Sequence, residues 1–524
     1  MAEALAADAR REIEAHGLTI DEAERQLALL RDPPPPADLV RACVRGDGIR
    51  ALETHEHARL EAAADRVVAA GRVTKMVPAS GAATRMFHTL LRARAGGDPI
   101  PARRLLRELR RFPFYAALAA IWPGGADALD RAAEAGDPAP VLDVLLGGAG
   151  DADGDRTASG LGLADRPKAL IPFHVVDGVA RTAFDEHLAE AAGHLADDAG
   201  RVRAHVTVGA AHRSAFDEAL AQGLAPTLAE ELGVTFDVGF SVQRPSTDTL
   251  ALGADDAPMR AASGDLLFRP GGHGALIDNL HALATGSAAA DLVLIRNIDN
   301  VQPPQHRGVV VRWQRRLLGL LAELQARIHN VLDRLDEDVE ILDDPRWRAD
   351  VLDFVADGLG VPEIRERADA SSSDLAAALR DALDRPLRVC GMVPNEGEPG
   401  GGPYWVRGAS GRVRRQIVES AQIDSDDPAQ AAIVAGATHF NPVDLACALR
   451  DRAGAPYDLA RYVDPQTAFV ADKSLDGRPL RALERPGLWN GAMAGWLTVF
   501  VEVPAATFAP VKTIFDLLRS EHQP

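Results

Sequence analysis

Apolar residues in the middle of the chain recur in short runs that are separated by longer amphipathic stretches. The short runs have the length and composition of buried strands and cover residues 73–77, 169–176, 205–208, 234–240 and 292–295. The stretches at 181–195, 214–222 and 276–283 carry apolar residues at helical spacing. Strands that alternate with helices are typical of parallel sheets, because a parallel connection must cross back over the sheet. The pattern therefore predicts the α/β fold class, with a mainly parallel, Rossmann-like sheet.

Two further regions show helical spacing over most of their length. Residues 1–70 are rich in Ala, Glu, Arg and Leu and are interrupted by four prolines at 33–36, so we expect a helical N-terminal region. Residues 306–385 carry an apolar stripe with many charges opposite it, which predicts a helical insertion packed against the core. The segments 71–305 and 386–524 would then form the α/β core.

Charge and composition narrow the range of partners. The 524 residues carry a formal net charge of −19, which repels polyanions, so we expect no nucleic-acid partner. No apolar run reaches the roughly 18 residues of a membrane-spanning helix, and the first residues lack the pattern of a secretory signal. Three widely spaced cysteines have no metal-finger spacing and indicate reduced thiols. We therefore expect a cytoplasmic protein with small-molecule partners and no membrane contact.

A glycine-rich turn at 270–274 is the first candidate for ligand chemistry. An apolar run at 266–268 leads into it, a helical pattern follows, and the run at 292–295 ends in Asn297-Ile298-Asp299-Asn300, which together predict one βαβ unit. Glycines at such a turn let backbone N–H groups approach a phosphate, and a carboxylate such as Asp299 beside a phosphate is a natural Mg²⁺ ligand. The alternative is an ordinary turn in which Asp299 caps the next helix.

A second small-residue turn follows the run at 73–77. Ser80, Gly81 and Ala82 would let the backbone come close to a ligand, Thr84 can donate a hydroxyl, and Arg85 can reach a triphosphate. The alternative is a serine N-cap on a structural helix.

Several single residues at predicted element ends are further candidates. Lys168, at the start of a predicted strand, could bring a positive charge to the cleft, and Gln243 could read a base through its amide. The glycine- and proline-rich loop at 391–403 carries Glu398, and the polar and aromatic clusters at 438–444 and 487–493 carry Asn441 and Asn490. Carboxylates and amides of this kind suit sugar hydroxyls, while tryptophan suits the apolar face of a sugar.

Three motifs, one of them near the end of the sequence, resemble those of one enzyme family. Pro510-Val511-Lys512 followed by Asp516-Leu517-Leu518 is similar to the late lysine motif of UDP-sugar pyrophosphorylases, Pro270-Gly271-Gly272-His273-Gly274 to their Pro-Gly-His-Gly turn, and Asn297-Ile298-Asp299-Asn300 to their metal-binding motif. More closely, residues 77–87 and 488–493 resemble a bacterial family called domain of unknown function 4301. The departures from the pyrophosphorylase pattern are the low glycine content of the turn at 80–83 and Ala275 in place of an acidic residue.

The resemblance implies a Rossmann-like nucleotidyltransferase sheet, with a nucleotide-binding core at 71–305 and a sugar-binding region within 386–524. It implies that Gly81 and Arg85 hold the nucleotide, Gly272 and His273 its base and ribose, Asp299 the Mg²⁺, and Lys512 the phosphates. The implied reaction joins a nucleoside triphosphate and a sugar 1-phosphate into a nucleotide sugar and pyrophosphate. Because the sugar phosphate is already an anion, the protein needs cations, with Lys168 among them, and no general base.

Two alternatives to this reaction stay open at the level of sequence. A glycosyltransferase that consumes a nucleotide sugar could use the same sheet and metal, and would transfer sugar without releasing pyrophosphate. A protein that only binds nucleotide sugars would gain thermal stability from the ligand and form no product.

Overall fold

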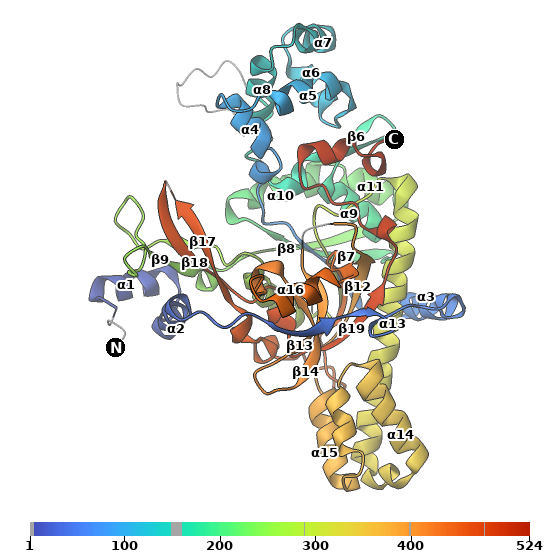
Figure 1. The fold of residues 1–524 in the computed structure, drawn as a ribbon. Helices are drawn as coiled ribbons and strands as arrows, with labels where there is room; N and C mark the ends of the chain where they lie inside the picture. Colours follow the sequence, from blue (N-terminus) through green and yellow to red (C-terminus); the bar gives the residue numbers. More distant parts are fainter. Residues whose placement is uncertain (1–4, 148–159, 288, 398–399, 476) are drawn as a thin grey trace.

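The centre of the protein is a ten-stranded sheet in a computed structural model that describes residues 5–147, 160–287, 289–397, 400–475 and 477–524 (Figure 1). In spatial order its strands are β2 (Val44–Arg45), β3 (Gly48–Arg50), β19 (Leu497–Glu502), β12 (Leu387–Pro394), β16 (Asp444–Ala448), β11 (Leu292–Arg296), β4 (Val73–Pro78), β7 (Arg201–Val208) and β8 (Thr235–Val242), with β15 (His439–Phe440) beside β12. Within this order, only the pairings of β16 with β12 and β11 are antiparallel. The predicted mixed α/β fold with a mainly parallel central sheet is therefore confirmed.

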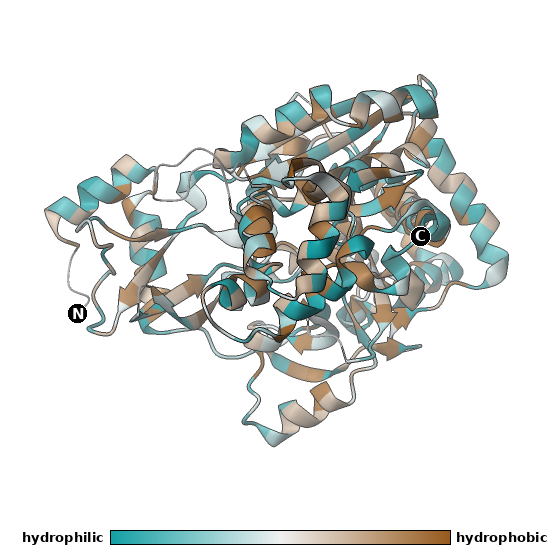
Figure 2. Ribbon diagram, turned by 90° about the horizontal axis from the view of Figure 1, so that it is seen from above, coloured by the Kyte–Doolittle hydropathy of each residue, from teal (hydrophilic) through white to brown (hydrophobic). Residues whose placement is uncertain are grey.

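Both faces of the sheet are covered, as the apolar runs of the strands require. Along β11, Leu292 and Leu294 pack into a core shared with α3 (Thr54–Ala69) and α13 (Pro304–Glu337), whereas Val293 and Ile295 pack toward α12 (Leu276–Thr285). Figure 2 shows the same division, with hydrophobic residues on the inner strands and mostly hydrophilic residues on the peripheral helices. A strand that is buried on both faces reads as a continuous apolar run, which explains the sequence pattern.

The long helix α13 forms the backbone of the helical region. At Gly319 it lies against α3 so closely that a Cβ atom would stand 1.9 Å from the carbonyl oxygen of Leu60. The lower part of α13 packs with α14 (Pro345–Asp353) and α15 (Ser372–Leu383), while α4 (His88–Arg94) to α8 (Ala139–Leu146) lie at the opposite end (Figure 1). The helical character predicted for 306–385 agrees with these helices, and the division of the chain into domains stays a prediction.

The expectation of a helical N-terminal region at 1–70 is wrong for residues 38–50. Helices α1 (Ala7–His16), α2 (Ile20–Arg31) and α3 are present, but β1 (Asp38–Ala42) pairs antiparallel with β13 (Gly402–Arg407), and β2 and β3 extend the central sheet. The proline run ends α2, and the short segment after it finds its hydrogen-bond partners in strands more than 350 residues away.

The expected βαβ unit around the turn at 270–274 is also wrong. The segment before the turn forms only β10 (Phe268–Arg269), which pairs antiparallel with β9 (Thr249–Gly253) in a separate sheet that also contains β18 (Arg478–Glu484) and β17 (Phe469–Leu475). Leu266 is buried with α1 and α2 and not with the central strands. The apolar run at 266–268 therefore serves a second small core, which periodicity alone does not distinguish from a central strand.

No helix in the described part of the chain is both long and apolar enough to cross a membrane.

Candidate functional site

Four neighbouring strands end at the same edge of the central sheet. Strands β11, β4, β7 and β8 are parallel neighbours, so the loops that follow them, at 297–300, 79–85, 209–212 and 243–247, lie side by side. With a strand spacing of about 4.8 Å, this edge is about 14 Å long. Ligands of open α/β sheets bind outside the carboxyl ends of the strands. The structure thus places most of the predicted site residues at the edge where such a ligand belongs.

Lys168 and Asp299 meet at this edge. The Lys168 Nζ lies 2.7 Å from the Asp299 Oδ2, and both side chains are partly exposed, at 16% and 22%. The Lys168 backbone N–H donates to the Gly81 carbonyl at 3.1 Å. Lys168 lies in a 3-10 turn, η3 (Lys168–Leu170), so the expectation that it begins a strand is wrong. Pro167 pairs with Ala82, and this backbone contact carries the lysine to the Ser80 turn.

The segment that carries Lys512 is attached to the same loop. The Val511 N–H donates to the Asp299 carbonyl at 3.0 Å, and the Ala509 N–H donates to the Asn300 Oδ1 at 3.0 Å. Lys512 is exposed and lines a cleft of about 680 Å³ between the end of β12 and the 505–521 segment. These backbone contacts therefore bring the segment of Lys512 next to the Asp299 loop, although the two residues are more than 200 positions apart in the sequence.

The Ser80 turn has an open surface. Ser80 is half-buried, Gly81, Ala82, Thr84 and Arg85 are exposed, and a Cβ atom on Gly81 would have no atom within 4 Å. The Thr84 hydroxyl donates to the Ala164 carbonyl at 3.3 Å. Arg85 lies in η1 (Ala83–Arg85) and forms no ion pair with any residue that the structure describes. Its guanidinium group is therefore available to an anionic ligand.

Gln243, at the end of β8, contacts the glycine turn. Its Nε2 donates to the Gly272 carbonyl at 2.7 Å. His273, which follows Gly272, stacks on Trp489 with the ring centroids 5.1 Å apart. The His273 Nε2 lies 3.1 Å from the Glu419 Oε1. Glu419 is a site neighbour that the sequence analysis missed. The only signal there is the capping box that Glu419 forms with Gln422 before a short helical turn.

The three predicted sugar contacts have different outcomes. Glu398 lies outside the described residues. Asn441 precedes β16 at the same edge, is 7% exposed, and accepts a hydrogen bond from the Val443 N–H at 3.0 Å. Asn490 is only 1% exposed and donates to the Gln422 Oε1 at 3.1 Å, so the structure does not present it to a ligand. Its amide instead supports the segment that carries Trp489.

Buried charges lie directly beneath the Asp299 loop. The Lys75 Nζ donates to the Glu190 Oε1 at 2.8 Å, and Arg296 forms an ion pair with Asp444. The Arg296 Nε also donates to the Asn300 carbonyl at 2.7 Å. Sequence reasoning missed this network, although Lys75 and Arg296 stand out as charges at or within apolar strand runs. Charges placed there need partners, because an unpaired buried charge is strongly unfavourable.

The protonation states of the network follow from its burial. Desolvation lowers the pKa of Lys75. Burial alone would raise the pKa of Glu190, but the charges of Lys75 and Arg296 outweigh it and bring this pKa well below its usual range. Burial, followed by the charge on Lys75, lowers the pKa of His187 well below its ordinary value. His187 is therefore neutral, and its Nε2 lies 3.2 Å from the Asn297 carbonyl oxygen and 3.3 Å from that of Ile298, where an N–H donates. The network fixes the backbone of the loop that presents Asp299.

The family model described as "Domain of unknown function (DUF4301)" matches residues 6–523. The chain belongs to the DUF4301 family. No curated protein matches this DUF4301 chain.

Solved structures similar to this DUF4301 protein share little sequence with it. A mutant UDP-glucose pyrophosphorylase from Leishmania major in complex with UDP-glucose is 12% identical, with a TM-score of 0.44 and coverage of 99% of this chain and 82% of that one. The uridine diphosphate N-acetylglucosamine pyrophosphorylase from Trypanosoma brucei in complex with an inhibitor is 13% identical, with a TM-score of 0.45 and coverage of 98% and 79%.

Proposed function

We propose that this DUF4301 protein is a nucleotidyltransferase that joins a nucleoside triphosphate and a sugar 1-phosphate, with release of pyrophosphate. The observation that carries the proposal is the convergence of three distant segments on Asp299. The Lys168 side chain contacts the Asp299 carboxylate, and the Lys168 backbone contacts Gly81. The Val511 backbone contacts the Asp299 carbonyl. An open small-residue turn, a carboxylate and several cations at one sheet edge form a set suited to phosphates.

The proposed reaction needs charge neutralisation and alignment. An oxygen of the sugar 1-phosphate attacks the α-phosphorus of the triphosphate, the bond to the β-phosphate oxygen breaks, and pyrophosphate leaves. We assign the Gly81 backbone to the triphosphate, and Arg85, Lys168 and Lys512 to the negative charge on the phosphates. Gln243 and His273 lie toward the β8 end of the edge, where we place the base and ribose. The cations carry the catalysis, so no general base is assigned.

The residues at the edge fit a magnesium ion whose coordination shell is completed by the substrate. No cluster of three or more His, Cys, Asp or Glu side chains able to hold a metal occurs among the described residues. Asp299 is a single, partly exposed carboxylate beside the proposed phosphate site. Mg²⁺ commonly binds through one or two carboxylates together with substrate phosphates and water. We therefore propose Asp299 as its protein ligand, where the ion would neutralise phosphate charge.

A pyrophosphate-release screen tests the proposal. The purified protein is incubated with Mg²⁺ and each common nucleoside triphosphate crossed with a panel of sugar 1-phosphates. Release above background for one pair, abolished by EDTA and by Asp299→Asn, is the expected result. Failure of every pair, together with a melting temperature raised by a nucleotide sugar, would make this a binding protein. Sugar transfer from a nucleotide sugar without pyrophosphate would make it a glycosyltransferase.

A further inference from the structure

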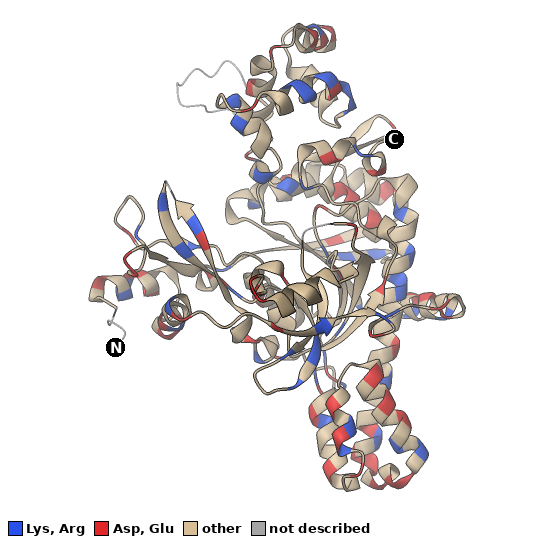
Figure 3. Ribbon diagram, in the orientation of Figure 1, with Lys and Arg blue, Asp and Glu red and all other residues tan. Residues whose placement is uncertain are grey.

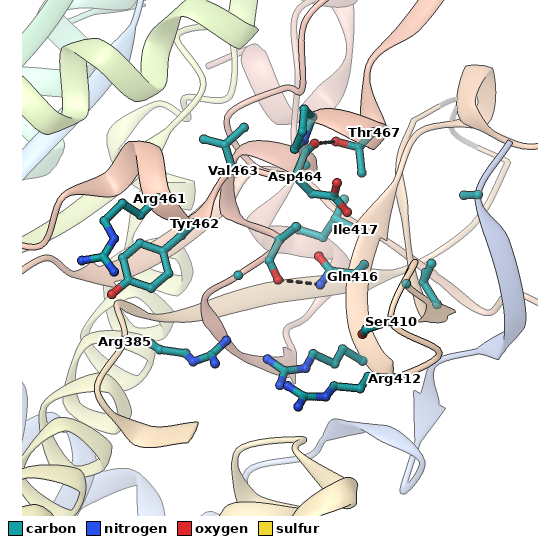
Figure 4. Close-up of a pocket in the computed structure, with 18 of the residues that line it drawn as sticks. Arg385, Ser410, Arg412, Gln416, Ile417, Arg461, Tyr462, Val463, Asp464 and Thr467 are labelled. Atoms are coloured by element: carbon teal, nitrogen blue, oxygen red, sulfur yellow. Dashed lines mark hydrogen bonds between the residues drawn. The ribbon is translucent and has the colours of Figure 1, made fainter. Parts of the chain in front are cut away.

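A cavity of about 760 Å³ lies between β14 (Val413–Val418), the end of α15 and the 461–467 segment (Figure 4). Arginines share its lining with Asp381, Asp384 and Asp464, and two of the arginines pair with further acids outside the lining. Positive and negative charges are therefore matched there, and the cavity indicates no class of ligand. The free edge of the central sheet is a more specific feature.

Strand β8 forms one edge of the ten-stranded sheet, and no described strand pairs with its outer side. The Thr235 N–H donates to the Gly200 carbonyl at 2.8 Å, directly before β7, so the peptide groups of Thr235 point inward. Because these groups alternate in direction along a strand, those of Phe236, Val238 and Phe240 point outward. The Arg213 side chain reaches the Phe240 carbonyl, at 3.4 Å. The rest of the edge is open to hydrogen bonds from another strand.

Other strand edges of this protein carry the protections that natural sheets use. Strand β2, at the opposite edge of the central sheet, has only two residues. At β1, the Gln430 amide accepts from the Leu39 N–H at 3.0 Å and donates to the Leu39 carbonyl at 3.2 Å. Strand β17 carries exposed Asp472 and Lys473. In contrast, β8 is eight residues long and regular, and it contains neither proline nor lysine.

Exposed apolar side chains flank this unprotected edge. Leu232, the last residue of α11 (Ala225–Leu232), is 46% exposed, and Val242, the last residue of β8, is 36% exposed. Asp237 is the only charged residue between them in the sequence. Figure 3 shows that charged residues gather instead on peripheral helices such as α14 and α15. The surface around β8 is therefore one that a second acidic chain can approach.

The sequence of β8 is complementary to an antiparallel copy of itself. With a two-fold axis at Val238, Phe236 of one copy lies opposite Phe240 of the other, and Asp237 lies opposite Gly239. The outward peptide groups then face one another, as an antiparallel ladder requires. Opposed aromatic side chains stabilise strand pairs, whereas an axis at Asp237 would set two carboxylates against each other.

We propose that two copies of this protein associate through β8, antiparallel and with the two-fold axis at Val238, so that their central sheets join into one. A single strand pair is small beside the roughly 1,600 Å² of a standard interface, so we expect a Kd in the micromolar range. The association is independent of the proposed nucleotidyl transfer, and either can fail without the other.

Sedimentation equilibrium of the full chain across the micromolar range tests the proposal. The average mass should rise with concentration from the 55.7 kDa of one chain toward twice that value. A closed two-fold interface should stop there. Hydrogen exchange within residues 235–242 should slow as the mass rises. A mass that stays at 55.7 kDa, or that rises past two chains, would overturn the proposal.

Two variants test whether β8 is the interface. Val238→Pro removes an outward N–H that β7 does not use, and Val242→Asp sets a charge against Val234 of the second copy. Each should raise the Kd of the dimer at least tenfold. Val242→Asp changes an exposed side chain, so it decides the question if the proline variant does not fold. Val434→Asp, at a valine of α16 (Pro428–Ala435) that is 39% exposed, is the matched control and should dimerise normally.

The pattern among these variants decides between interfaces and registers. A dimer that Val242→Asp leaves unchanged, or that Val434→Asp weakens equally, would overturn the assignment to β8. Asp237→Asn should leave the Kd within about twofold, because Asp237 faces a glycine in the proposed register. A dimer tightened tenfold by Asp237→Asn would overturn the axis at Val238.

Discussion

The Lys168 Nζ and the Asp299 Oδ2 lie 2.7 Å apart, although 130 residues separate them in the sequence. Each side chain is too exposed for the pair to be a main source of stability, because ion pairs with access to water contribute about 1 kcal/mol or less. Both side chains also lie where substrate could replace their contact, because a phosphate could pair with Lys168 and a metal ion could bind Asp299. We therefore propose that substrate rearranges this pair.

Removal of either charge should affect turnover far more than stability. We expect Lys168→Gln and Asp299→Asn each to lower kcat/KM for the active substrate pair at least a hundredfold, and to change the free energy of unfolding by about 1 kcal/mol or less. Pyrophosphate release and urea denaturation measure the two quantities. Asp217→Asn, which breaks an exposed ion pair with Arg213, should change neither. Near-normal turnover in either site variant would remove that residue from the assignment.

The buried pair beneath the loop should behave in the opposite way. The Lys75 and Glu190 side chains are 2% and 1% exposed, so Glu190→Gln leaves a buried ammonium without a counter-charge. We expect that variant to lose about 3–5 kcal/mol of unfolding free energy in urea denaturation. The double variant Lys75→Met/Glu190→Gln should recover much of this loss, because no lone charge remains. A double variant as unstable as the single one would show that the charge pair is not the cause.

A substitution at Gly81 should affect ligand binding but not the stability of the fold. A Cβ atom at Gly81 meets open space, so Gly81→Ala should keep the melting temperature within about 1–2 °C of the unmodified protein. The added methyl group stands where the backbone must approach a phosphate, so we expect kcat/KM to fall at least fivefold. Gly436→Ala, at the end of α16 (Pro428–Ala435), is the matched control and should retain full activity. Full activity of Gly81→Ala would exclude close phosphate contact at this turn.

Acid should destabilise the protein partly through His522. Burial, followed by its neighbour His174, lowers the pKa of His522 to about 4 from an ordinary value of 6.5. Below pH 6.5 the unfolded chain therefore takes up a proton that the folded chain refuses, so the unfolding free energy falls as the pH falls from about 6.5 to about 4. Between pH 6.5 and 5 this amounts to at most about 2 kcal/mol.

Denaturation of His522→Gln at several pH values isolates this contribution. The variant should lose less stability than the unmodified protein over the same pH range, whereas His55→Gln, at an exposed position, should keep the unmodified slope. Equal slopes for His522→Gln and the unmodified protein would contradict the assignment.

Local patterns predicted β4, β7, β8 and β11 and the turns that follow them, because strands inside a sheet leave short apolar runs. They did not predict β12, β16 or β19, and the run at 169–176 forms β5 (Pro172–Val176), which pairs with β6 (Val179–Thr182) outside the central sheet. They could not show that β10 belongs to a different sheet, or that residues 38–50 pair with strands near the other end of the chain, since both depend on partners distant in sequence. The same limit applies to the site. The chemistry of single residues was enough to select Lys168, Asp299 and Lys512 as candidates. The position of Glu419 beside His273 and the ion pair of Lys75 with Glu190 arise only from tertiary contacts.

The pairing of β3 with β19 has a consequence for synthesis. Apart from its local pairing with β2, β3 pairs through Ile49 and Arg50 with Phe500 and Val501, so this second pairing must wait for some 450 further residues to be made. At a translation rate of about 5–20 residues per second this delay is roughly 20–90 s. During that interval a ribosome-bound chain exposes an unpaired strand edge, which makes nascent chains of this protein natural clients for chaperones.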